Sequence, residues 1–318
     1  MNAKFGDIQW TTVNPVEPYY FFKPVDLSQA DEYNTGISLA DLFPAYLGGV
    51  KTHDDGNLIS FTSFNTGCDY LYDYRPFDIR HINYDRRKVS RDRYDIMRHM
   101  IDNRLHYSNR GIPVLCPMYL YEDGKAKPNV NSEMVSMITE KTGISFSESL
   151  VESETEFDIM DLFDYSYGIL NSPLYIEKYI DLLKIEFPKV PIPNGNEMFW
   201  RIVAYGRRLR KLHLLEEDIG NPMGISFEGV GDNIVSSRKL KPEGLYINRT
   251  QLFTNVTEEI WDFCYGGYHG LQKWFKDRNG MKLSEDDIQH VIRVLNVFEK
   301  TISIREDLDI CMDEFGLI

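Results

Sequence analysis

The chain has 318 residues, of which 42% are hydrophobic, 26% charged and 13% aromatic, a globular composition that excludes an intrinsically disordered or fibrous protein. No apolar run reaches the roughly 18 to 20 residues of a membrane helix, and the N-terminus lacks the layout of a signal peptide, so we expect a cytoplasmic chain without a membrane partner. The 35 Lys and Arg against 49 Asp and Glu give a net charge of −14, which taken alone argues against a nucleic-acid partner.

Short strands and turns are predicted for the first 88 residues or so. Prolines at positions 15, 18 and 24 exclude a helix in the N-terminal stretch. The runs 19–22 and 58–62 are rich in residues that favour strands, and turn-forming residues lie between them. This part of the chain is therefore expected to be rich in β-structure.

One helix is predicted within this strand-rich part. Ser90 is a suitable cap for a helix that ends at Met100 or Leu105, because apolar residues recur every three or four positions on one face. Basic residues occupy much of the opposite face. After Pro113, a strand is expected over residues 114–121, closed by a turn at 122–124.

Helical periodicity dominates from about residue 131. Asn196 and Ser284 are predicted to cap two of the helices, and Gly143 is predicted to end another. The predicted helices are 132–142, 158–171, 173–187, 196–212, 258–265, 270–277 and 284 to about 305. Glycines punctuate residues 220–248, which indicates strands and turns there.

These elements predict an α+β fold with a β-rich N-terminal third and a predominantly helical remainder. Two subdomains are expected. Residues 1–130 form the β-rich subdomain with the basic helix, and residues 131–318 form a mainly helical subdomain with a short strand-rich insertion near 220–250. Short connections throughout indicate that the two subdomains pack closely.

No cofactor and no metal site is predicted. The cysteines at 68, 116, 264 and 311 are too far apart for a zinc site, and we expect them to be small buried apolar residues. The pairs Gly229-x-Gly231 and Gly266-Gly267 lack the spacing of a phosphate-binding loop and are expected in turns. No methyltransferase motif is present, and Asp123-Gly124-Lys125 matches only the minimal pattern of a metal-dependent nuclease.

The charge is unevenly distributed along the chain. Residues 75–110 contain ten Lys or Arg and five Asp, a net charge of +5, with three Tyr interspersed. This composition is typical of a surface that follows DNA phosphates while a few Arg side chains reach base edges. The alternative is a solvated helix face whose cations pair with the local Asp residues. The cluster between Arg201 and His213 is a weaker candidate, because exposed helix faces are often basic.

Several blocks of sequence occur in an order that resembles a known family. They are residues 43–55, 74–80, 117–121 with 127–129, 170–175, 187–193, 212–216 and 266–268 with 272–278. Together they resemble the C-terminal specificity region of type ISP and related single-chain restriction-modification enzymes, which are N6-adenine DNA methyltransferases. The resemblance extends from about residue 10 to 309, but only residues 107–116 stand where the family has a longer strand-rich stretch.

In that family a methyltransferase domain, often with nuclease and helicase domains, precedes this region, which supplies target recognition. The resemblance therefore implies a DNA target-recognition domain without catalysis of its own, whose partners are double-stranded DNA and methyltransferase or nuclease domains or subunits. A separate recognition domain is physically reasonable. The methyltransferase domain must extrude its target adenine from the duplex, and a second domain can fix the position of the enzyme on the DNA and read the flanking bases.

We predict two groups of DNA-contacting residues. Phosphate contacts are assigned to Arg86, Arg87, Lys88, Arg91 and Arg93, and base contact or packing to Arg75, Arg80, Arg98 and Arg104. Arg75 and Arg80 could equally form structural ion pairs with Asp78. Two alternative functions stay open. One is a protein-interaction subunit that docks on a methyltransferase or nuclease, and the other is a stand-alone nuclease that uses Asp123 and Lys125.

Overall fold

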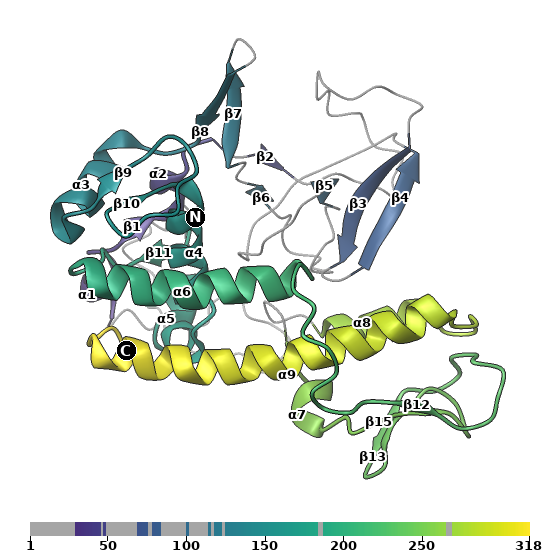
Figure 1. The fold of residues 1–318 in the computed structure, drawn as a ribbon. Helices are drawn as coiled ribbons and strands as arrows, with labels where there is room; N and C mark the ends of the chain where they lie inside the picture. Colours follow the sequence, from purple (N-terminus) through teal and green to yellow (C-terminus); the bar gives the residue numbers. More distant parts are fainter. Residues whose placement is uncertain are drawn as a thin grey trace, which may run out of the picture.

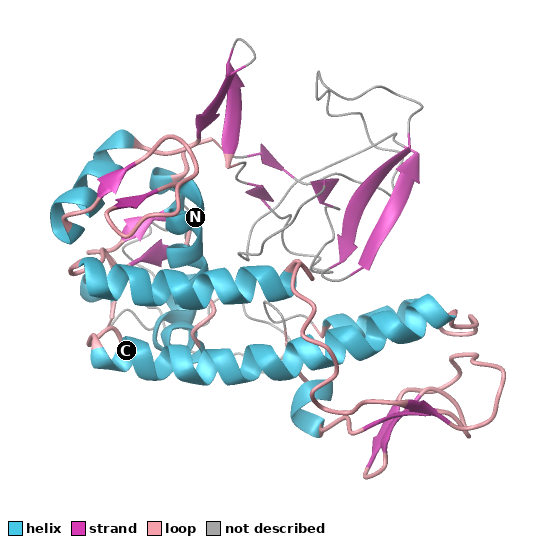
Figure 2. Cartoon of the chain, viewed as in Figure 1, coloured by secondary structure: helices cyan, strands magenta, loops and turns pink. Residues whose placement is uncertain are grey.

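The computed structural model describes most of the second half of the chain and separate parts of the first. The described residues are 29–45, 47–48, 69–75, 78–83, 100–101, 114–115, 118–122, 125–183, 187–264 and 269–318. Helices and small sheets both occur among them, which confirms the α+β class (Figure 2). The β-rich N-terminal third lies largely outside these residues and stays a prediction.

The helical part follows the predicted elements closely. The helices of the described residues are α1 (Ala30–Tyr33), α2 (Leu39–Leu42), α3 (Ser132–Thr142), α4 (Ile159–Ile169), α5 (Pro173–Leu183), α6 (Asn196–His213), α7 (Glu258–Trp261), α8 (Gly270–Asp277) and α9 (Glu285–Glu314). Helices α3 and α8 coincide with their predicted ranges. None of the helices in the described ranges is long and apolar enough to cross a membrane.

Local signals explain where these helices begin and end. The Asn131 side chain accepts a hydrogen bond from the Glu133 amide at the start of α3, and Gly143 ends that helix with a φ of 74°. Ser284 and Asp287 form a reciprocal capping box at the start of α9. The predicted cap at Asn196 is wrong. Gly195 is the cap residue of α6, and Asn196 is the first helical residue.

Helix α9 is longer and α7 shorter than predicted. The α9 helix continues to Glu314 rather than to about residue 305, because Leu308, Cys311 and Met312 continue its buried face. Helix α7 ends at Trp261 instead of residue 265. The length of a helix thus depends on the surface available to bury its apolar face.

The core is built around α4. Apart from Met160, every residue of this helix is buried. Helix α6 packs directly against α4, and α9 lies beside α6 and contacts it (Figure 1). Gly206 allows the close approach of α4 and α6, since a Cβ atom there would lie 1.8 Å from the carbonyl oxygen of Asp164.

The described strands form small sheets. Two-stranded pairs are β1 (Ile37–Ser38) with β11 (Lys189–Val190), β2 (Leu47–Gly48) with β6 (Val114–Leu115), β7 (Tyr119–Glu122) with β8 (Lys125–Pro128), and β9 (Ser145–Phe146) with β10 (Glu156–Phe157). A three-stranded sheet has the order β4 (Asp78–Asn83), β3 (Asp69–Arg75), β5 (Met100–Ile101). A four-stranded antiparallel sheet has the order β12 (Phe227–Glu228), β15 (Leu252–Thr254), β14 (Gly244–Tyr246), β13 (Lys239–Lys241).

Two predictions in the first half of the chain require correction. The basic helix cannot continue past residue 99, because Met100 and Ile101 form β5 and pair in parallel with Tyr72 and Asp73 of β3. The single strand predicted over residues 114–121 is two strands with different partners, since β6 pairs with β2 and β7 forms a hairpin with β8. Met100 and Ile101 pair with a strand distant in sequence, and so does β6, whereas β7 pairs with the adjacent strand β8.

Candidate nucleic-acid interface

Two of the predicted DNA-contacting residues lie on the three-stranded sheet. Arg75 is the last residue of β3 and stands opposite Asp78, the first residue of β4. Arg80 is in the middle part of β4 and stands opposite Tyr72. The backbone register thus pairs Arg75 with Asp78 and Arg80 with Tyr72, and the roles assigned to the two arginines stay predictions.

The other predicted contacts fall outside the described residues. They are Arg86, Arg87, Lys88, Arg91, Arg93, Arg98 and Arg104. All but the last belong to the chain between Asn83 at the end of β4 and Met100 at the start of β5. Both of these strands pair with β3. The connection that carries most of the predicted cations is therefore anchored at both ends in one sheet.

Three of the five Lys and Arg residues in the weaker basic cluster on α6 pair with carboxylates, and the other two, Arg208 and Lys211, are exposed. The Arg207 guanidinium donates to Asp161 at 2.6 Å, and Arg210 donates two hydrogen bonds to Asp164 at 2.6 and 2.9 Å. Arg201, nearer the start of the helix, donates to Glu314 at 2.5 Å. These three cations join α6 to α4 and α9, so the geometry supports a structural role for them rather than phosphate binding.

The electrostatics of this cluster follow from burial. Asp164 has no exposed side-chain surface, and burial raises the pKa of its carboxyl group while the Arg210 guanidinium opposes the rise. Burial likewise raises the pKa of the Asp161 carboxyl group, and the hydrogen bond from Arg207 opposes this rise. A bidentate pair of this kind holds the ionised carboxylate in one geometry and fixes α6 against α4.

A second polar network is buried at the end of α6. The hydroxyl group of Thr301 donates to the Val297 carbonyl at 2.7 Å, so it accepts from Nε2 of His213 at 3.0 Å. The Tyr167 hydroxyl then donates to Nδ1 of His213 at 2.6 Å. Burial lowers the pKa of His213 well below 6.5, and the charge of Arg305 adds to this effect. The network therefore requires a neutral imidazole.

We expect His213 to make the fold less stable in mild acid. The unfolded histidine binds a proton below about pH 6.5, whereas the folded one does not, so the unfolded state gains protons as the pH falls. Between about pH 7.5 and 5.5 this amounts to about 1 kcal/mol in the free energy of unfolding. Urea titrations of the wild type and of His213→Gln should differ by this loss, and equal pH dependence of the two proteins would contradict the assignment.

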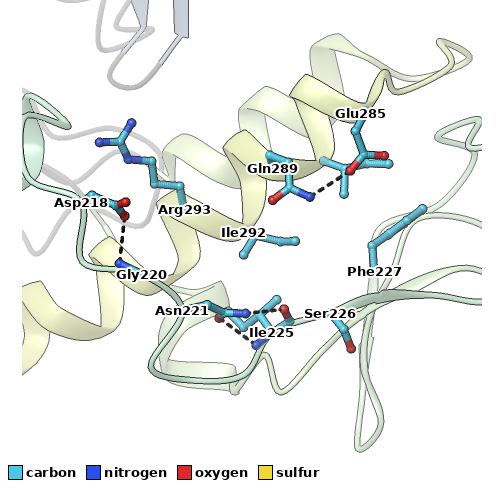
Figure 3. A pocket seen from close by; sticks show the side chains of 11 residues that line it. Asp218, Gly220, Asn221, Ile225, Ser226, Phe227, Glu285, Gln289, Ile292 and Arg293 are labelled. Carbon is cyan, nitrogen blue, oxygen red and sulfur yellow. Dashed lines mark hydrogen bonds between the residues drawn. The ribbon is translucent and has the colours of Figure 1, made fainter.

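An open cavity of about 830 Å³ lies between residues 218–227 and the first turns of α9 (Figure 3). Asp218 and Glu285 contribute carboxylates to its lining. Arg293 is engaged, because its Nη2 donates to the carbonyl oxygens of Leu215 at 2.6 Å and Glu217 at 3.3 Å. With two carboxylates and one engaged guanidinium, this cavity does not fit a nucleic-acid phosphate backbone.

The structure also describes some of the remaining sequence motifs, namely part of the glycine pairs, Lys125 and two of the cysteines. Gly229 has a φ of 99° and lies against the carbonyl of Thr250, as expected for a turn glycine. Lys125 is an exposed residue at the start of β8, and Asp123 and the Gly266-Gly267 pair lie outside the described residues. Cys311 is buried as predicted, but the prediction for Cys264 is wrong, because this residue is partly exposed and its sulfur lies 3.3 Å from Nε2 of His269. Cys68 and Cys116 lie outside the described residues. Within the part of the chain that is described, no group of three His, Cys, Asp or Glu side chains could hold a metal ion.

The four-stranded sheet carries a group of cations that was not predicted as a site. Residues 236–250 contain four Lys or Arg and one Glu, and all five side chains are exposed. A window of this length shows the excess directly, but the more basic segment 75–110 dominated the charge pattern. The strand register is required to see which face of the sheet these cations occupy.

The comparisons with known proteins agree on one architecture. The model of the Type ISP C-terminal specificity domain matches residues 103–307. The fold is similar to that of the ATP-dependent Type ISP restriction-modification enzyme LlaBIII bound to DNA, with a TM-score of 0.63 and 17% identity over 87% of this chain and 24% of that one. It is also similar to the DrdV–DNA complex, with a TM-score of 0.66 and 15% identity over 96% of this chain and 40% of that one.

A third similar structure is a nuclease-deletion mutant of the Type ISP enzyme LlaGI in complex with a DNA substrate mimic, with a TM-score of 0.59 and 15% identity over 95% of this chain and 30% of that one. The chain thus spans between a quarter and two fifths of the length of these enzymes. A search of curated proteins gives no match.

Proposed function

The chain belongs to the family of Type ISP C-terminal specificity domains, and from this we infer that it is a DNA target-recognition domain of a restriction-modification enzyme. The observation that carries the proposal is the family match over residues 103–307, together with a fold shared with enzymes whose structures contain DNA. Double-stranded DNA is the proposed partner, and methyltransferase and nuclease domains or subunits are proposed to perform the chemistry.

The proposed mechanism separates anchoring from sequence recognition. Arg86, Arg87, Lys88, Arg91 and Arg93 are proposed to bind phosphates and so to fix the register of the domain on the duplex. Arg75, Arg80, Arg98 and Arg104 are proposed for base contact or packing. The same proposal includes a division into two subdomains, residues 1–130 and 131–318. It also includes a β-rich N-terminal third and a cytoplasmic location. The ion pairs of α4, α6 and α9 support it by providing a rigid scaffold.

We expect the wild-type chain to bind duplex DNA with an affinity that falls steeply with salt. Each phosphate contact releases condensed counterions, so five contacts predict a slope of about −4 to −5 in a plot of log K against log salt concentration. Fluorescence anisotropy of a labelled duplex measures this slope. Selection from a pool of random duplexes is expected to enrich one short sequence. Absence of binding at about 50 mM salt would refute autonomous DNA recognition.

The alternative of a protein-interaction subunit has one observation in its favour. In the similar enzymes this fold covers only 24%, 30% or 40% of the chain, so the rest of that chain provides further domains beside it. If the chain binds no DNA alone but copurifies with a methyltransferase or nuclease and binds DNA in that complex, the interaction role replaces the autonomous one. A nuclease that uses Lys125 would instead cleave DNA in a metal-dependent manner and lose this activity on Lys125→Ala.

A further inference from the structure

The four-stranded sheet has one buried and one solvent-facing side. Leu245 of β14 and Phe253 of β15 are fully buried and stand opposite each other, and the Phe253 ring packs against Phe275 of α8 with centroids 6.0 Å apart. Leu245 pairs with Leu240 of β13, and both point to the buried side. Because side chains alternate along a strand, Lys239 and Lys241 on either side of Leu240, and Tyr246 after Leu245, point to the solvent-facing side. Lys239 stands opposite Tyr246, and both lie on this outer face.

Lys241 shares the outer face with Tyr246. Its ammonium nitrogen lies 3.8 Å from the centroid of the Tyr246 ring, which places both side chains on the same side of the sheet. The amides of Ser236 and Ser237 both donate to the Ile247 carbonyl at 2.8 Å. These bonds hold the start of β13 against the end of β14, so Arg238 and Arg249 flank the same end of the sheet.

The cations of the sheet have no carboxylate partner among the described salt bridges, whereas Arg201, Arg207 and Arg210 of α6 each pair with one. The salt bridges of the described residues include Arg201, Arg207 and Arg210, but none includes the exposed cations Arg238, Lys239, Lys241 or Arg249. Residues 236–250 have a net charge of +3 in a chain whose net charge is −14. Glu243 is the single carboxylate in that segment and lies in the turn between β13 and β14. Glu228 of β12 lies on the same face, because the register aligns it through Leu252 and Tyr246 with Lys239, but β12 is at the opposite edge of the sheet. The half of the sheet formed by β13 and β14 is thus a basic surface on an acidic protein.

We propose that the outer face of β13 and β14, with Lys239 and Lys241 and with Arg249 at the adjoining end of the sheet, is a second DNA-contacting surface that binds the phosphate backbone of the duplex. It rests on the proposed function and deepens it, because it adds a contact separate from residues 75–104. Exposed cations in a local excess provide the sequence-independent part of DNA binding. Contacts of this kind position the domain and leave base recognition to other residues.

One structural explanation competes with this proposal. The β13 strand is at the edge of its sheet, and lysines on an edge strand prevent association with other strands. That explanation accounts for Lys239 and Lys241 only. Arg249 lies in the connection between β14 and β15, away from the open edge, and needs no such role. A surface that binds phosphates accounts for Arg249 as well as for the two lysines.

The test compares two triple variants of the full chain in salt titrations with a labelled duplex. Lys239→Gln, Lys241→Gln and Arg249→Gln together should reduce the steepness of the log K against log salt plot by about two to three and weaken binding at least about tenfold at moderate salt. The matched control removes three solvent-accessible cations from α3, α8 and α9, outside the candidate surfaces, by Lys141→Gln, Lys276→Gln and Lys300→Gln. This control should stay within about twofold of the wild type.

Each result decides between the explanations. Weaker binding and a shallower slope only in the sheet variant support the proposal. A sheet variant that keeps the wild-type slope overturns it while the proposed function stands, and self-association of that variant would assign the lysines to edge protection. A wild-type chain that binds no duplex overturns both. Circular dichroism and thermal unfolding of both variants check that the fold is kept.

Discussion

Reversing the charge of three arginines in the basic segment should abolish duplex binding. The change Arg86→Glu, Arg87→Glu and Arg91→Glu removes three proposed phosphate contacts and places three carboxylates where they repel the DNA backbone. We expect a loss of at least about 100-fold in affinity and a salt dependence about three units shallower. Fluorescence anisotropy with a labelled duplex measures both quantities.

The control for this experiment has the same change in net charge. Lys141→Glu, Lys276→Glu and Lys300→Glu reverse three solvent-accessible cations on α3, α8 and α9, outside the basic segment and outside the cluster on α6. If binding depended only on total charge, the control would lose as much affinity as the test variant, and the assignment to residues 86–91 would fail. Local phosphate contacts predict that the control binds within a few-fold of the wild type.

The second large effect is expected where α4 crosses α6. Replacing Gly206 by Ala should destabilise the fold by about 3 kcal/mol, although Ala favours a helix by about 1 kcal/mol over Gly. The added Cβ would lie 1.8 Å from the Asp164 carbonyl oxygen and 3.0 Å from the Gly168 amide nitrogen, and both are backbone atoms. The helices would have to separate and disturb the pair of Asp164 with Arg210. Urea denaturation gives the change in the free energy of unfolding.

Ala204 provides the matched control, because it is an exposed residue two positions earlier in the same helix. Ala204→Leu adds more volume than Gly206→Ala but meets solvent, so the expected change is within about 0.5 kcal/mol. A Gly206→Ala protein as stable as the wild type would show that the two helices can move apart at little cost, contrary to the close packing described above.

The helical half was predictable because its signals are local. Asn131, Gly143, Ser284 and the spacing of apolar residues lie within one or two turns of the helix ends that they determine. The ends that were predicted wrongly lack such signals. Helix α9 continues past Arg305 because its buried face continues, and this requires knowledge of the neighbouring helices.

Strand pairing was less predictable because its partners are distant in sequence. Met100 and Ile101 fit the apolar face of a helix equally well, and β3 recruits them as a strand from nearly thirty residues away. Residues 114–121 likewise contain one apolar run but supply two strands to two sheets. In both cases the hydrophobic pattern allows several structures, and backbone pairing selects one.

The role of the charged residues depends both on their distribution along the sequence and on their partners in the folded chain. Counting residues identified the basic segment 75–110 and the weaker clusters, but it could not separate cations with buried partners from cations that face solvent. Arg207 and Arg210 meet Asp161 and Asp164 across 46 positions of sequence, which no local window reveals. The cations of β13 have no such partners among the described salt bridges.

By itself the sequence determined the α+β class, the helices of the second half and the partition of charge, because these depend on composition and short-range spacing. It also contained the ordered blocks that indicated the specificity-domain family, which the family match confirms. Only the tertiary structure decided the strand partners, the glycine contact between α4 and α6, and which cations are neutralised. These features arise where segments distant in sequence meet, since hydrogen bonds, packing and ion pairs act through space over a few ångströms.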